Sequence, residues 1–207
     1  AAEGFTVEMP LLPGHGTSVD DLMDCTWADW SSAAESVYRE LAQRVERTFV
    51  VGLSMGATLT AWLASRHEEI AGIAVVNGVL APQPEIADLL TALMDAGETT
   101  MDAIGNDIAK DGADELAYER VPLAALMSLG TALDEICADF VSIRCPVLVL
   151  NAPEDHVVSP ASSDHFAAAV SGPVTRVSLD RSYHVATLDH DAELIQRETV
   201  AFVNQHR

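Results

Sequence analysis

The stretch from Thr48 to Ala57, Thr-Phe-Val-Val-Gly-Leu-Ser-Met-Gly-Ala, constrains the fold more than any other part of the chain. It begins as a β-branched and aromatic run typical of a strand, and helix-forming residues follow it. Gly52 and Gly56 lie two positions either side of Ser54, a spacing that lets a strand turn sharply into a closely packed helix. Such a turn presents a hydroxyl at a helix N-terminus and predicts Ser54 as a nucleophile. In an ordinary glycine-rich loop the serine would only cap a helix.

Length and composition indicate a globular chain with an acidic surface. With 207 residues, 49% of them hydrophobic, the chain can bury a substantial core. Its 32 acidic and 11 basic residues give a net charge of −21, which repels nucleic-acid phosphates and anionic lipid headgroups. We therefore expect no nucleic-acid partner. No apolar run approaches the roughly 20 residues that span a bilayer, so we expect no stable membrane insertion.

The cysteines favour a reducing compartment. Cys25, Cys137 and Cys145 are odd in number and show no Cys-x-x-Cys spacing. This pattern is typical of reduced thiols in a cytoplasmic protein, which is the location we expect.

Strand and helix patterns alternate along most of the chain. Apolar or alternating runs predict strands at residues 5–9, 48–53, 70–76, 146–151 and 174–179. Helices are expected from Ser31 or Ser32 to about residue 47, directly after Ser54, and at 160–170 and 192–204. Residues 1–4 are typical of a helix end, with Gly4 as its C-cap.

Residues 81–139 break this alternation, since they show helices and acidic loops with no convincing strand. We expect an α/β fold with a mostly parallel sheet flanked by helices. Residues 1–80 and 140–207 would form its core, and residues 81–139 would form a small helical cap insertion.

A serine nucleophile needs a base and a carboxylate that orients the base. In chains whose nucleophilic serine lies on a sharp turn from a strand to a helix, the catalytic residues occur in the order serine, acid, histidine. Each of them follows a strand. The strand at 146–151 leads to Glu154 and Asp155, and either could be the acid. The strand at 174–179 leads to His184, the candidate base. The acidic residues around His190 lack a second ligand pair at a recognisable spacing, so no metal is expected.

Together these residues resemble the carboxylesterase and monoacylglycerol-lipase branch of the α/β-hydrolase family, over essentially the whole chain. The motifs are Leu-Pro-Gly-His-Gly (12–16), Trp-Ala-Asp-Trp (27–30), Gly-Leu-Ser-Met-Gly (52–56), Pro-Glu-Asp-His-Val-Val (153–158) and Ser-Tyr-His-Val-Ala-Thr-Leu-Asp (182–189). The resemblance implies Ser54 as nucleophile, Asp155 rather than Glu154 as acid, and His184 as base. It also implies a short helical cap over the site.

The resemblance further implies an oxyanion hole with two backbone N–H donors, one of them from Met55. In the family the other donor comes from a His-Gly-Phe or His-Gly-Gly loop after a third strand. That strand would lie between the strands expected at 5–9 and 48–53, and the printed sequence shows no such motif upstream of them. Residues preceding Ala1 are the simplest source, a strand from another chain is a second explanation, and a true fragment is a third. Without a second donor, turnover would fall roughly 10²–10³-fold.

We therefore expect a serine hydrolase that cleaves carboxylic esters through an acyl-enzyme on Ser54, as a carboxylesterase or a monoacylglycerol lipase. No cofactor is needed. The expected partner is a small-molecule ester with an apolar acyl chain. An acyl thioesterase and a non-catalytic scaffold that binds a ligand or partner are the alternatives.

Overall fold

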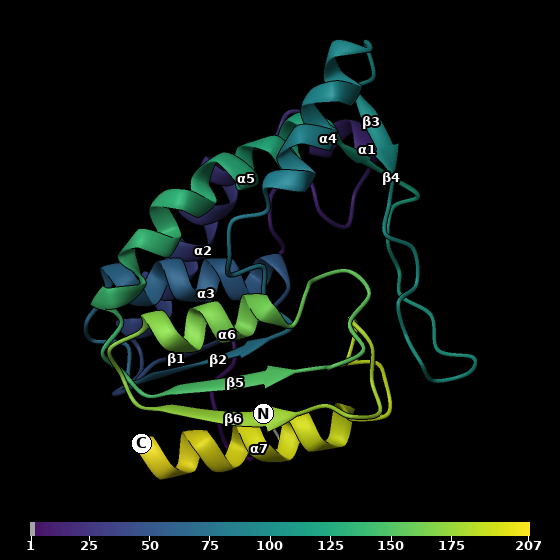
Figure 1. The fold of residues 1–207 in the computed structure, drawn as a ribbon. Helices are drawn as coiled ribbons and strands as arrows, with labels where there is room; N and C mark the ends of the chain where they lie inside the picture. The colour runs from purple at the N-terminus through teal and green to yellow at the C-terminus, as the bar shows by residue number, and fades with distance from the viewer. Residues whose placement is uncertain (1–2) are drawn as a thin grey trace.

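The computed structural model describes residues 3–207 and is built on a four-stranded parallel sheet (Figure 1). Its strands lie in the order β1 (Phe49–Leu53), β2 (Gly72–Val76), β5 (Val147–Asn151) and β6 (Val174–Ser178). In register, Val50 lies opposite Ile73, and Ile73 opposite Val147. The expected parallel α/β sheet is confirmed.

Helices cover both faces of this sheet (Figure 1). One face carries α2 (Trp27–Ala42), α3 (Met55–Arg66) and α6 (Ala161–Ala169), and the other carries α7 (Ala192–His206). Because side chains alternate along a strand, Ile73 and Val75 of β2 pack in the core that includes α3. Ala74 and Val76 pack in the core that includes α7. Every residue of β2 is therefore buried.

Residues 81–139, here called the cap segment, contain α4 (Pro84–Asp95), β3 (Thr100–Asp102), β4 (Arg120–Pro122) and α5 (Leu123–Ala138). The expectation of no strand is wrong here, because β3 and β4 pair in antiparallel register. Each has three residues, too short for a pattern of alternating hydrophobicity to show. The short helices α1 (Val19–Met23) and η1 (Asp139–Ser142) complete the helices of the described chain. The division into core and cap domains stays a prediction.

The N-terminal region differs from expectation in two places. Residues 5–9 form no strand, since no other strand of the described chain lies beside them, and Met9 is 91% exposed. The helix expected from Ser31 begins at Trp27, because Thr26 and Asp29 form a capping box there. Gly4 has the positive φ of 81° that a C-cap requires, but residues 1–2 of the expected helix end lie outside the described residues.

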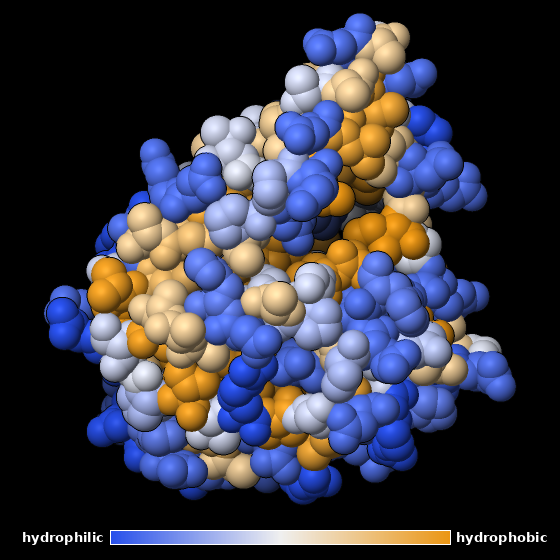
Figure 2. All heavy atoms as spheres, viewed as in Figure 1, coloured by the Kyte–Doolittle hydropathy of each residue, from blue (hydrophilic) through white to orange (hydrophobic). Residues whose placement is uncertain are grey.

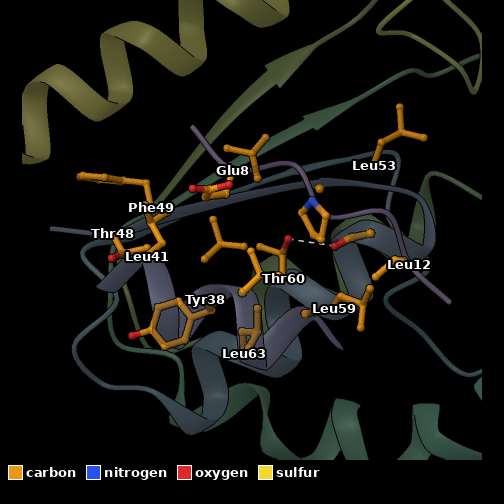
Figure 3. Close-up of a pocket in the computed structure, with 17 residues that line it drawn as sticks. Glu8, Leu12, Tyr38, Leu41, Thr48, Phe49, Leu53, Leu59, Thr60 and Leu63 are labelled. Atoms are coloured by element: carbon orange, nitrogen blue, oxygen red, sulfur yellow. Dashed lines mark hydrogen bonds between the residues drawn. The ribbon is translucent and has the colours of Figure 1, made fainter. Parts of the chain in front are cut away.

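The outer edge of β1 borders a groove of about 320 Å³ (Figure 3). It is lined by Glu8 and Leu12 of the N-terminal segment, by β1, and by Leu59 and Leu63 of α3. The resemblance places a further strand at this position. Ser54, Asp155 and His184 are not among the residues that line the groove, whereas Leu53 and Gly56, on either side of Ser54 in the sequence, are.

In the described part of the chain, no helix is both long and apolar enough to cross a membrane. The three cysteines are free thiols, and burial raises the pKa of Cys137 and Cys145 to about 11.

The two glycines around Ser54 have different packing and give the first prediction. A Cβ on Gly52 would lie 2.0 Å from the carbonyl O of Gly56, whereas one on Gly56 would meet nothing within 4 Å. We expect Gly52→Ala to lower the free energy of unfolding by about 3 kcal/mol or more, since the strand and helix must separate. The matched variant Gly56→Ala should change it by less than about 1 kcal/mol. Urea unfolding of both variants measures these changes, and equal losses in the free energy of unfolding would contradict this packing.

Candidate active site

Ser54 connects β1 to α3 as a single residue with strained backbone. Its φ of 54° and ψ of −120° are unfavourable for a side chain with a Cβ. Its N–H donates to the carbonyl O of Val76 at 3.0 Å, and its own carbonyl O accepts the N–H of Ala57 at 3.0 Å. The close approach of Gly52 to Gly56 completes the turn. This is the local geometry that the sequence predicts.

Ser54, His184 and Asp155 form one continuous chain of hydrogen bonds. The Ser54 hydroxyl donates to Nε2 of His184 at 3.0 Å, and Nδ1–H of His184 donates to Oδ2 of Asp155 at 2.9 Å. Because an ionised carboxylate only accepts, Nδ1 carries the proton and the Nε2 lone pair faces the hydroxyl. The structure thus brings together the three residues that the sequence singles out, in the geometry of a general base beside a nucleophile.

The structure also distinguishes Asp155 from the alternative acid, Glu154, by the hydrogen bonds that each makes. The Asp155 side chain is 2% exposed, and its Oδ1 accepts the N–H groups of Val157 and Val158, both at 2.8 Å. These bonds fix the carboxylate so that Oδ2 faces His184. Glu154 is exposed and makes no hydrogen bond to that histidine.

Asn77 is a site residue that the sequence analysis missed. Its side-chain NH₂ donates to the carbonyl O atoms of Tyr183 at 3.1 Å and His184 at 2.8 Å, and its Oδ1 accepts the N–H of Ala152 at 2.8 Å. It follows β2 with a positive φ of 43° and ties the loop of the base to the strand end before the acid. The Asn-Gly pair at 77–78 was a signal for a special backbone conformation, but its partners are distant in sequence.

Asp189 ties the same histidine loop to the cap segment. It is 2% exposed, and its two oxygens accept four backbone N–H groups: Tyr183 (2.9 Å), His190 (2.7 Å), Ala109 (2.7 Å) and Lys110 (2.9 Å). Burial acts to raise the pKa of this carboxyl, but the four N–H donors outweigh burial and hold its pKa below the usual value. Asp189 is therefore a buried anion stabilised by hydrogen bonds.

Met55 is the residue that the resemblance implies as an oxyanion donor, and it directly follows Ser54. As the first residue of α3, it has a backbone N–H with no acceptor inside the helix, at the end where the helix dipole favours negative charge.

His15 lies in a different environment, since its ring bonds the carbonyl O of Pro13 and contacts the edge of Trp30. Within residues 3–207, no group of three or more His, Cys, Asp or Glu side chains could hold a metal ion.

The second prediction concerns Asp189. In Asp189→Asn an NH₂ group replaces one oxygen and faces two backbone N–H donors, so the free energy of unfolding should fall by about 2 kcal/mol or more at neutral pH. Because the pKa of the folded protein's carboxyl is lowered, the carboxylate stabilises the fold at pH values above 3.8, the ordinary pKa of an aspartate. This stabilisation is lost as the pH falls below 3.8 and through the lowered pKa. The gap between the two proteins should therefore narrow in acid. Asp164→Asn, at a 66% exposed surface ion pair, is the matched control and should change stability by less than about 1 kcal/mol. Urea unfolding at neutral and acid pH measures both.

Three comparisons with known proteins point to one family of enzymes. The family model described as Serine aminopeptidase, S33 (Hydrolase_4) matches residues 1–191. The thermostable monoacylglycerol lipase of Bacillus sp. (strain H-257) is 38% identical over 209 residues, covering 100% of this chain and 82% of that protein. A solved structure from work on LipS and LipT, two metagenome-derived lipolytic enzymes, is 35% identical with a TM-score of 0.90, covering 95% of this chain and 81% of that chain.

A more distant structure, the monoacylglycerol lipase of Paleococcus ferrophilus, shares the fold, with 18% identity and a TM-score of 0.70 over 88% of this chain and 77% of that one. The predicted α/β-hydrolase fold is confirmed, as is the predicted class of enzyme, a serine hydrolase of carboxylic esters. Since the family model spans most of its length, the chain belongs to the S33 (Hydrolase_4) family of α/β-hydrolases.

Proposed function

We propose that the protein hydrolyses esters through an acyl-enzyme on Ser54, with His184 as general base and Asp155 as its orienting acid. The supporting observation is the hydrogen-bond chain from the Ser54 hydroxyl through His184 to Asp155. The Ser54 oxygen attacks the ester carbonyl carbon while Nε2 of His184 takes the hydroxyl proton. Asp155 stabilises the imidazolium that forms. The Met55 N–H donates to the oxyanion of the tetrahedral intermediate.

The same groups then release the products. The tetrahedral intermediate collapses, the bond to the alcohol oxygen breaks, and the imidazolium of His184 donates its proton to that oxygen. Water enters, His184 takes one of its protons, and the resulting hydroxide attacks the acyl carbonyl of Ser54. Collapse of the second intermediate releases the carboxylic acid, and His184 donates its proton to the Ser54 oxygen, which restores the serine hydroxyl and the neutral base.

The substrate that we propose is a neutral ester with an apolar acyl chain, such as a monoacylglycerol. Figure 2 shows apolar side chains gathered on the cap segment and around a hollow between it and the core. Exposed apolar residues of this segment are Ile86, Leu89, Met94, Ile104 and Leu116. The similar Bacillus protein is named a monoacylglycerol lipase. The net charge of −21 supports a neutral substrate over a coenzyme A thioester, whose phosphates it would repel.

We also propose a cytoplasmic location. The support is the three free cysteines, which an oxidising compartment would tend to pair.

The third prediction tests the nucleophile and base. A fluorophosphonate should add once to the protein, as read by intact-mass spectrometry, and Ser54→Ala should abolish the adduct. Ser54→Ala and His184→Ala should each lower kcat for a monoacylglycerol by at least about 10⁴-fold. Ser32→Ala, on an exposed helix surface, is the matched control and should keep both signals. A wild-type protein with no adduct and no turnover would instead favour the non-catalytic scaffold.

The fourth prediction separates esters from thioesters. At low ionic strength, kcat/KM for a medium-chain monoacylglycerol should exceed that for the coenzyme A thioester of the same acid by at least about tenfold. Added salt should narrow the gap, because it screens the repulsion of the phosphates. A faster thioester reaction at every salt concentration would refute the monoacylglycerol proposal and support a thioesterase.

A further inference from the structure

Asp107 of the cap segment contacts the backbone of the candidate base. It lies between β3 and β4, 77 residues before His184 in the sequence. Its Oδ2 accepts the backbone N–H of His184 at 2.9 Å, and its own carbonyl O accepts the N–H of Val185 at 3.1 Å. One cap residue therefore bonds two consecutive peptide groups at the base.

The same carboxylate reaches the loop that carries the acid. Oδ2 of Asp107 also accepts the backbone N–H of His156 at 3.3 Å, and its Oδ1 accepts the ring Nδ1–H of His156 at 2.8 Å. His156 directly follows Asp155 in the chain. Asp107 thus connects the acid loop to the base loop, outside the hydrogen-bond chain that ends at Ser54.

The environment keeps Asp107 ionised. Its side chain is 13% exposed, and burial opposes the charge. Hydrogen bonds from the His156 ring and from the N–H groups of His184 and His156 outweigh burial and lower its pKa. The bond to Asp107 in turn raises the pKa of His156. At neutral pH this carboxylate has only acceptor oxygens, which suits all three donors.

The peptide groups of His184 are consequently held from both sides. Asn77, at the end of β2, donates to the carbonyl O of His184 at 2.8 Å, and Asp107, in the cap segment, accepts its N–H. Ser54 and Asp155 bond the two ends of the imidazole, which fixes the rotation of the ring. The hydrogen bonds to the His184 backbone fix the position of the main chain from which the ring extends.

We propose that Asp107 is a positioning residue for ester hydrolysis, which sets the distance between Nε2 of His184 and the Ser54 hydroxyl through the His184 backbone. This inference rests on the proposed roles of Ser54, His184 and Asp155. Asp107 bonds no reacting atom and is not a catalytic residue. A displacement of about 1 Å between reacting groups can cost about 100-fold in rate, so an anchor of this kind acts on turnover more than on substrate binding.

Three substitutions of Asp107 separate its roles. Asp107→Ala removes the acceptor. Asp107→Asn keeps the size, and its amide oxygen can still accept the His184 N–H while the NH₂ faces a neutral His156 ring. Asp107→Glu keeps the charge but moves the oxygens along a longer side chain. The matched control is Tyr118→Phe, which removes hydrogen bonds from the cap segment to Gly14 and Thr17 without touching His184.

The fifth prediction is read from kcat, KM and the rate of fluorophosphonate labelling. Asp107→Ala should lower kcat by about 10–100-fold and slow labelling by a similar factor, with KM within about twofold of the wild type. Asp107→Glu should also lose turnover, whereas Asp107→Asn should stay within about threefold. Tyr118→Phe should keep its kcat even if its melting temperature falls. If Asp107→Ala does not fold, the contrast between the Asn and Glu variants decides.

Three results would overturn this role. Wild-type turnover in Asp107→Ala would show that the anchor is unnecessary. An equal loss in Asp107→Asn and Asp107→Ala would assign the effect to charge rather than to the hydrogen bond. A similar loss of kcat in Tyr118→Phe would assign it to general loosening of the cap segment. Failure of the wild-type protein to label at Ser54 is a different result, because it refutes the proposed function itself.

Discussion

The strained backbone at Ser54 is the constraint on which the other parts of the site depend. A residue with a Cβ at φ 54° costs about 1–3 kcal/mol, and such strain persists only where the surroundings impose it. Here β1 ends one residue before Ser54 and α3 begins one residue after it. The contact of Gly52 with Gly56 brings the strand and helix together. The hydroxyl must therefore project above the sheet edge, where only residues that follow other strands can reach it.

The parallel sheet supplies those residues in spatial order. The carboxyl ends of β1, β2, β5 and β6 lie at one edge, and they lead to Ser54, Asn77, Asp155 and His184 respectively. Asn77 lies between the strand that leads to Ser54 and the strand that leads to Asp155, which explains why its side chain can bond both the loop of Asp155 and the loop of His184. The parallel order of the four strands thus brings the residues of the hydrogen-bond chain to one edge of the sheet.

This arrangement explains which residues the sequence could predict. Ser54 and His184 each follow a recognisable strand, so local pattern and chain order pointed to them. The same pattern left Glu154 and Asp155 open, and only the family resemblance selected Asp155. Asn77 and Asp107 act on partners 49 to 107 residues away, and no local pattern marks such a bond. Residues 5–9 show the opposite case, in which a local pattern predicts an element that does not form. Their alternation of apolar and polar residues is correct for a strand, but a strand also requires a neighbouring strand to pair with. The capping box of Thr26 and Asp29 was visible in principle and would have placed the start of α2.

The cap segment is held in two different ways. Residues 107–110 are tied to the base loop by the carboxylates of Asp107 and Asp189, whose hydrogen bonds are directional and short. By contrast, α4 buries only Leu90, and packs mainly against α5 by apolar contact. Apolar contacts tolerate sliding, whereas bonds of fixed direction do not. The cap residues beside His184 are therefore fixed in direction by hydrogen bonds, whereas α4 is held by its packing against α5.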